Sequence, residues 1–269
     1  MTLTIETVPQ PRDLGAVNWL GLWTLTGKET KRFVKVFTQT ILAPVITTLL
    51  FYAVFALALG GGNRSVHGIP FLEFLPPGLI MMSMAQNAFA NTSSSLVISK
   101  VQGNIVDVLM TPLSPFEFTL GYMLGGIARG LAIGFVSVLT LAAFADMTIW
   151  HLGYILYHAL MGSMMLALLG VLGGLWSEKF DHMAAVQNFI IMPATFLSGT
   201  FYTADRLPGA WRLLAHLNPF FYMIDGFRYG FIGISDGTLG TGLVVMAATN
   251  VVLFALAYRL IVKGYKLKY

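Results

Sequence analysis

Few side chains in this sequence have the types and spacing that catalysis requires. Gly27-Lys28, with another glycine six residues earlier, has some likeness to a phosphate-binding loop. That loop needs four residues between its glycines and Ser or Thr directly after the lysine, whereas here five residues intervene and Glu29 follows. His151 and His158 are seven residues apart, and two ligands alone do not make a metal site. Without a Ser, His and Asp set or paired carboxylates near one face, we predict no catalytic centre, metal site or cofactor in this chain.

Arg129 is the one charged residue inside an otherwise apolar stretch, Phe118–Ala145. It lies about 12 residues, or ~18 Å of helix, from the start of that stretch. A buried guanidinium needs an anion or a carbonyl oxygen as partner, so we expect Arg129 to face other helices rather than lipid. Two interpretations remain open: a structural ion pair or carbonyl contact, and a contact with the anionic head group of a transported molecule.

Six long hydrophobic stretches make up most of the chain. Each holds at least the ~20 residues that a helix needs, at ~1.5 Å per residue, to cross a ~30 Å hydrocarbon layer. Because bare backbone cannot stay unpaired in lipid, we interpret them as six transmembrane helices of an all-α membrane protein. In chain order the stretches are Val36–Asn63, Phe74–Ser99, Phe118–Ala145, Met147–Ser177, His182–Ala204 and Gly237–Tyr258.

Flanking charges orient these helices. All eight lysines lie on what would be one side of the membrane, and the loops of the other side hold none. By the positive-inside rule, both termini are therefore cytoplasmic. The net charge of +4 belongs to these flanks and implies no nucleic acid. A composition of 56% hydrophobic and 10% charged residues leaves no room for a sizeable soluble domain, and the absence of cysteine excludes disulfides and thiolate metal sites.

Two segments on the cytoplasmic side have amphipathic patterns. In residues 14–35, basic residues recur at i, i+3, i+4 and i+7 beside tryptophans, which predicts a helix at the interface with anionic lipid heads. A charged lead-in to the first span is the alternative. Residues 99–111 place most of their apolar side chains on one helical face, and prolines end the segment. This short helix has a face with which to dock on lipid or a partner protein, unless it is a simple surface turn.

Residues 203–234, on the opposite side, are apolar but interrupted by charges and prolines. We predict two short helices, about Asp205–Leu217 and Phe220–Phe231, broken at Asn218-Pro219. They would dip into the outer leaflet and return, which requires that protein cover their backbone.

The second and fifth stretches carry polar side chains that are costly against lipid. Such groups face protein, water or cargo, and hydroxyl groups that stabilise helix packing are an equally good interpretation. They are Asn87, Asn91, Thr92, Ser93, Ser94 and Ser95 in the second stretch, and Asn188, Thr195, Ser198 and Thr200 in the fifth.

Several motifs resemble those of a known family. Leu197-Ser-Gly-Thr-Phe-Tyr202, Leu207-Pro208, Leu217-Asn-Pro-Phe-Phe-Tyr222 and Asp225-Gly-Phe-Arg228-Tyr-Gly230 resemble the outer hairpin of ABC-2-type exporter permeases. Leu109-Met-Thr-Pro-Leu-Ser-Pro115 with Gly121 resembles the segment that joins the family's coupling helix to its third span. The resemblance covers essentially the whole chain and is strongest to half-size bacterial permeases of the nodulation, drug-resistance and polysaccharide-export type.

The resemblance implies a single ABC-2-type transmembrane domain over residues 1–269. It implies pairing with a second copy and with two copies of a separate ATPase subunit, which would bind ATP and Mg. Residues 99–111 would be the coupling helix, with ATPase contacts from Lys100, Val101, Gln102, Ile105, Asp107, Val108 and Leu109. The translocation path would be lined by Asn87, Asn91, Ser94, Phe189, Thr195, Ser198 and Phe201. Residues marking the outer hairpin would be Pro208, Asn218, Pro219, Asp225 and Arg228.

These expectations describe the permease subunit of an exporter in the cell inner (cytoplasmic) membrane, moving an amphipathic or lipid-like substrate and contacting membrane lipids. The alternative is an ATP-independent secondary transporter or channel. Against that alternative, intramembrane carboxylates for proton coupling are scarce, and no internal repeat is detectable.

Overall fold

A computed structural model describes residues 15–59, 65–203 and 208–267, and most of them are helical. A two-residue antiparallel pair, β1 (Ser65–Val66) and β2 (Ile69–Pro70), precedes the longest helix. The helices are α1 (Trp19–Lys35), the π-helical turn η1 (Thr38–Leu42), α2 (Ala43–Leu59), α3 (Phe71–Val101), α4 (Ile105–Leu109), α5 (Pro115–Leu141), α6 (Leu152–Trp176), α7 (Phe180–Val186), the π-helical turn η2 (Gln187–Ile191), α8 (Met192–Phe196), α9 (Ala210–Leu217), α10 (Pro219–Ile232) and α11 (Leu239–Val262).

Four helical segments in the described part of the chain are long and apolar enough to cross a membrane. They are Thr38–Ala58, Pro115–Leu141, Leu152–Trp176 and Leu239–Val262, and they match the first, third, fourth and sixth predicted spans. The second predicted span is α3, which has 31 residues but a polar middle. The fifth is the helix of α7, η2 and α8, which runs over residues 180–196 only. The protein is therefore a multi-helix membrane protein, and the count of six spans stays a prediction.

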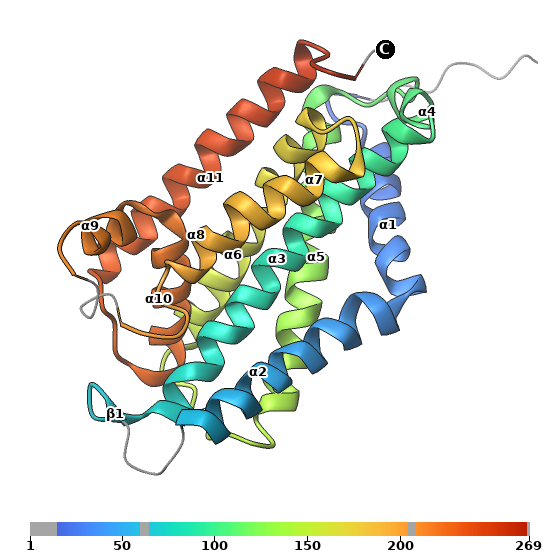
Figure 1. Ribbon diagram of the computed structural model, residues 1–269. Helices are drawn as coiled ribbons and strands as arrows, with labels where there is room; N and C mark the ends of the chain where they lie inside the picture. Colours follow the sequence, from blue (N-terminus) through green and yellow to red (C-terminus); the bar gives the residue numbers. More distant parts are fainter. Residues whose placement is uncertain (1–14, 60–64, 204–207, 268–269) are drawn as a thin grey trace, which may run out of the picture.

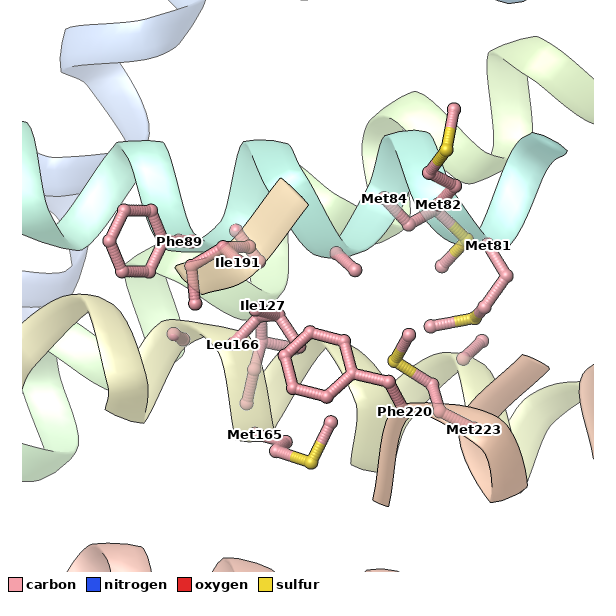
Figure 2. Packing of buried hydrophobic residues seen from close by; sticks show 14 of the residues in the cluster. Met81, Met82, Met84, Phe89, Ile127, Met165, Leu166, Ile191, Phe220 and Met223 are labelled. Atoms are coloured by element: carbon pink, nitrogen blue, oxygen red, sulfur yellow. The ribbon is translucent and has the colours of Figure 1, made fainter. Parts of the chain in front are cut away.

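α3 forms the centre of the structure and packs against α5, α6 and α10 (Figure 1). Figure 2 shows Met81 and Phe89 of α3 beside Leu166 of α6 and Met223 of α10, in a cluster from which solvent is excluded. Because α3 is covered on most sides by other helices, most of its polar residues are buried against protein, and Gln86, Asn87 and Ser94 remain partly exposed.

Local sequence signals set several helix ends. α5 begins with a capping box, in which the Ser114 hydroxyl accepts from the Glu117 N–H and the Glu117 carboxylate accepts from the Ser114 N–H. Pro115 occupies the first helical position, where its missing N–H costs nothing. α10 likewise begins with an Asn218 cap and Pro219. The predicted break of the 203–234 segment at Asn218-Pro219 is thus confirmed.

The two helices of that segment differ in their surroundings. α9 is largely exposed, whereas most side chains of α10 are buried against α6 and α3. α10 is therefore part of the helical core as well as half of a hairpin. Asp205 and Arg206 lie outside the described residues, and the depth of the hairpin in the outer leaflet stays a prediction.

A cysteine-labelling experiment tests the orientation. The native chain has no cysteine, and Ala210 at the start of α9 and Met110 after α4 are both exposed. In intact cells, a membrane-impermeant maleimide should label the Ala210→Cys variant and should leave the Met110→Cys variant unlabelled until lysis. The cysteine-free wild type is the control. Labelling of the Met110→Cys variant from outside would reverse the predicted orientation.

Candidate functional site

The segment predicted as one coupling helix is divided in two. α3 ends at Val101, Gly103 adopts a positive φ of 77°, and α4 covers Ile105–Leu109. A left-handed residue cannot continue an α-helix, so the expectation of a continuous helix over residues 99–111 is wrong. Ile105 is buried, and Val108 packs against the same core. The exposed side chains of residues 101–111 are Val101, Gln102, Asn104, Val106, Asp107, Leu109, Met110 and Thr111.

Lys100 turns inward instead of toward the surface. It is 3% exposed, and its Nζ donates to the carbonyl oxygens of Gly174 (3.0 Å) and Leu175 (2.8 Å) in the last turn of α6. Lys266 donates to the next carbonyl, that of Trp176, at 3.2 Å. Carbonyls at the end of a helix lack partners within the helix and favour positive charge nearby. Lys100 therefore fixes the end of α3 to the end of α6, and it offers no surface contact.

A groove of about 390 Å³ separates α1 from the α4 segment. Its lining includes apolar side chains of α1, α4 and the segment after α4, and Lys28 and Asp107 contribute opposite charges. Its full lining is Asn18, Leu20, Gly21, Thr24, Leu25, Lys28, Asp107, Val108, Thr111, Pro112 and Leu113. The groove thus lies between the two segments whose sequences predict amphipathic helices.

The basic helix α1 also reaches the polar middle of α3. Glu29 is fully buried, accepts from the Ser95 hydroxyl at 2.8 Å and lies 3.4 Å from Arg32. Arg32 donates to the backbone carbonyl of Asn91 at 2.6 Å and to its side-chain oxygen at 3.1 Å. On the α5 side, a side chain at Gly125 would collide with Glu29, so this glycine allows the close approach. The alternative interpretation of α1, as no more than a charged lead-in to the first span, is therefore insufficient. Buried polar contacts hold α1 against the other helices.

Arg129 points toward the same helix. Its Nη2 donates to the side-chain oxygen of Asn87 at 2.8 Å, and Asn87 in turn donates to the Ser83 carbonyl at 2.9 Å. No carboxylate in the described part of the chain forms an ion pair with Arg129. Arg129 therefore contacts a carbonyl oxygen, as one interpretation of the sequence suggested, and that oxygen belongs to the neutral carboxamide of Asn87.

The residues predicted to line a path fall into two groups. Asn91, Thr195 and Ser198 are buried and bonded to protein groups, including the Asn218 carboxamide, which donates to Ser198 at 2.9 Å. Partly or fully accessible residues are Asn87, Ser94, Phe189 and Phe201, of which Phe189 in η2 is 81% exposed. The structure therefore places packing groups and accessible groups together on α3 and on the segment from η2 to the turn after α8.

The hairpin residues fix neighbouring segments. Arg228 is buried, donates to the Gly199 carbonyl at 2.6 Å, and lies with its guanidinium carbon 3.9 Å from the centre of the Phe74 ring. Asp225 accepts from the backbone N–H groups of Asp236 (2.8 Å) and Gly237 (3.1 Å). Pro208 is exposed at the start of the described hairpin.

A family model described as "ABC-2 type transporter" matches residues 21–232, which include most of α1, the α4 segment and both helices of the hairpin, α9 and α10. The chain belongs to the ABC-2 type transporter family. It is 36% identical over 246 residues to "Inner membrane transport permease YadH" of Escherichia coli (strain K12), covering 91% of this chain and 96% of that protein. "Nodulation protein J" of Rhizobium leguminosarum bv. viciae is 26% identical over 230 residues, covering 81% and 84%. "Nodulation protein J" of Rhizobium meliloti (strain 1021) is 23% identical over 246 residues, covering 91% and 92%.

Two residues of this ABC-2 chain were missed from the sequence as site residues. Glu29 is the only acidic residue of α1. It is close in sequence to Lys28 and Lys31, and Arg32 follows it by three residues. That pattern marks a buried ion pair only once α1 is known to pack on α3 and α5. Arg32 was assigned to lipid head groups, whereas its contacts are with α3.

The Lys100 contacts predict a pH dependence of stability. Burial lowers the pKa of Lys100 from 10.5 to about 8, and repulsion by Lys266 adds to this shift. Between these pH values the unfolded chain binds a proton that the folded chain does not, so this residue makes stability rise with pH. The neutral amine still has two N–H donors for the two carbonyls.

We expect the thermal midpoint of the wild type in detergent to rise between about pH 8 and pH 10 relative to that of Lys100→Met. Lys263→Met, which alters an exposed lysine after α11, is the control and should follow the wild type. A Lys100→Met curve parallel to the wild-type curve would show that Lys100 is not buried in this way.

Proposed function

We propose that this chain is the permease subunit of an ATP-binding-cassette exporter in the inner membrane, with six spans and both termini cytoplasmic. Family membership supports the proposal, and the E. coli relative carries the name of an inner membrane transport permease. In the proposal, two copies form the translocation path, and a separate ATPase subunit binds ATP and Mg and drives transport of an amphipathic or lipid-like substrate.

The observation that carries this proposal is the uncovered cytoplasmic-side surface around α4. Val101, Val106 and Met110 are each more than half exposed, beside the groove that α1 and α4 form. Apolar side chains gathered next to a groove are typical of a surface that binds another protein. The sequence has no phosphate-binding loop of its own, so the energy source must be bound by that partner.

A second uncovered surface supports pairing with another copy. On α3, Gln86, Asn87, Ala90, Ser94 and Ile98 are only partly buried, and they recur with helical spacing on one side. Small and polar residues suit a protein or water-filled boundary better than lipid. By contrast, the surfaces of α2 and α11 that remain exposed are largely apolar and suit lipid. In the proposal, the α3 surface and the nearby η2 residue Phe189 face the path between protomers.

Charge reversal at α4 tests the ATPase contact. Asp107 is exposed and lines the groove, so Asp107→Lys should leave folding unchanged and reduce stimulation of the co-purified ATPase in vesicles by about fivefold or more. Substitution is preferable to deletion of residues 102–106, because deletion would remove the buried Ile105.

Asp181→Lys is the matched control, since Asp181 is an exposed residue of α7 away from the groove. Equal stimulation by the wild type and Asp107→Lys would remove α4 from the coupling role. Substrate movement by the permease without any ATPase would instead support a secondary transporter or channel.

A further inference from the structure

Arg129 carries a positive charge that the described residues do not neutralise. Its only hydrogen bond to another side chain is to the neutral carboxamide of Asn87, and its Nε is buried without a partner. Arg129 is partly exposed, at the depth of a predicted membrane span, where a charge without a counter-charge is costly. An anion at this point would remove that cost.

The neighbouring charges do not supply the missing anion. Glu29, the carboxylate that contacts this side of α3, is already paired with Arg32 and bonded to Ser95. Arg32 and Arg129 act on each other as like charges. Glu29, Arg32 and Arg129 together carry one net positive charge beside Asn87 and Asn91. The side-chain NH₂ of Asn91 is also buried without a partner.

A cavity of about 300 Å³ lies between α2 and α3 next to this charge. Asn87, which receives the Arg129 bond, is part of its wall, as are Gln39 of the π-helical turn η1 and Gln86 of α3. The side chains of Gln39 and Gln86 have no hydrogen-bond partner among the residues described. The rest of the wall is Ala43, Pro44, Thr47, Thr48, Phe51, Met82 and Ser83.

The wall of the cavity therefore has a polar part and an apolar part. The carboxamides of Gln39, Gln86 and Asn87, with Arg129 bonded to Asn87, are suited to an anionic group that accepts several hydrogen bonds. The hydroxyls of Thr47 and Thr48 already donate to backbone carbonyls of α2 and add no donor. Phe51, Met82 and Pro44 are suited to the first part of an alkyl chain. The basic face of α1, with Lys28, Lys31 and Lys35, follows on the predicted cytoplasmic side, where it attracts anions.

We propose that the cavity between α2 and α3, with Asn87 and Arg129, binds the anionic head group of a lipid-like molecule, and that the exporter's substrates belong to this class. The assignment rests on the proposed function and deepens it. The head group is a phosphate or carboxylate, and the binding residues are Arg129, Asn87, Gln86 and Gln39. Arg129 contributes the charge, and the carboxamides contribute hydrogen bonds.

Dodecyl phosphate is a direct probe of this site. Binding of the radiolabelled compound is measured on the permease alone in phosphatidylcholine nanodiscs and corrected for empty nanodiscs. We expect Arg129→Gln to weaken binding by about tenfold or more, because it removes a charge-assisted interaction. Asn87→Asp should weaken it as much, since the new carboxylate occupies the partner position of Arg129 with its own negative charge. Arg259→Gln, at an exposed arginine of α11, is the control and should bind as the wild type does.

Two competitors define the ligand chemistry. Unlabelled dodecyl glucoside keeps the chain and lacks the charge, and inorganic phosphate keeps the charge and lacks the chain. We expect neither to displace the probe at concentrations where unlabelled dodecyl phosphate does. Displacement by the glucoside would overturn the role of charge, and displacement by inorganic phosphate would overturn a lipid-like ligand. Unchanged binding by both Arg129→Gln and Asn87→Asp, with both variants folded, would overturn the site.

A second measurement separates a transported molecule from a resident lipid. With the ATPase subunit present, dodecyl phosphate should raise ATP hydrolysis by the wild type and not by Arg129→Gln. Binding that depends on Arg129 but leaves hydrolysis by an otherwise stimulated complex unchanged would overturn the substrate assignment. Because binding is measured without the ATPase, failure of the exporter proposal would appear as absent association with the ATPase and would leave the binding result unaffected.

Discussion

The structure depends on one constraint, which is that polar groups at membrane depth must find their partners within the protein. α3 carries amides and hydroxyls through its middle, and lipid offers them no hydrogen bonds. α3 is accordingly packed against α5, α6 and α10, and the basic helix α1 also contacts it. The Thr92 hydroxyl, for example, donates to the Ala167 carbonyl of α6 at 2.8 Å, which joins the two most closely packed helices.

The same constraint explains how the ends of helices are used. Lys100 and Lys266 satisfy the last carbonyls of α6, and Arg228 satisfies the Gly199 carbonyl beyond α8. Asn218 both caps α10 and donates to the Ala194 carbonyl of α8. Long cationic and carboxamide side chains thus replace the water that would solvate these carbonyls in a soluble protein. Each of these bonds also connects segments that are distant in the sequence.

These connections hold α4 and the start of α1 in a defined arrangement. The buried Ile105 holds α4 to the core, Lys100 holds the preceding helix end to α6, and Asn18 at the start of α1 donates its N–H to Glu117 in the capping box of α5. Buried bonds and packing, in addition to the loops, therefore connect α4 and α1 to α3, α5 and α6. In the proposed exporter, these connections would link the ATPase contact to the helices around the path.

The sequence by itself determined the membrane class, four of the candidate spans, the break at Asn218-Pro219 and the family. These features depend on composition and local spacing, which each stretch carries independently of the rest of the chain. It did not determine that Lys100 faces inward, that Gly103 divides residues 99–111 between α3 and α4, or that Glu29 and Arg32 contact α3. Hydrophobic periodicity places a residue on a face of its own helix, but the partner of that face is set by helix crossings between distant segments, 59 residues apart for Arg32 and Asn91. Only the tertiary structure decided which charges are neutralised, and it left Arg129 beside a carboxamide and a cavity.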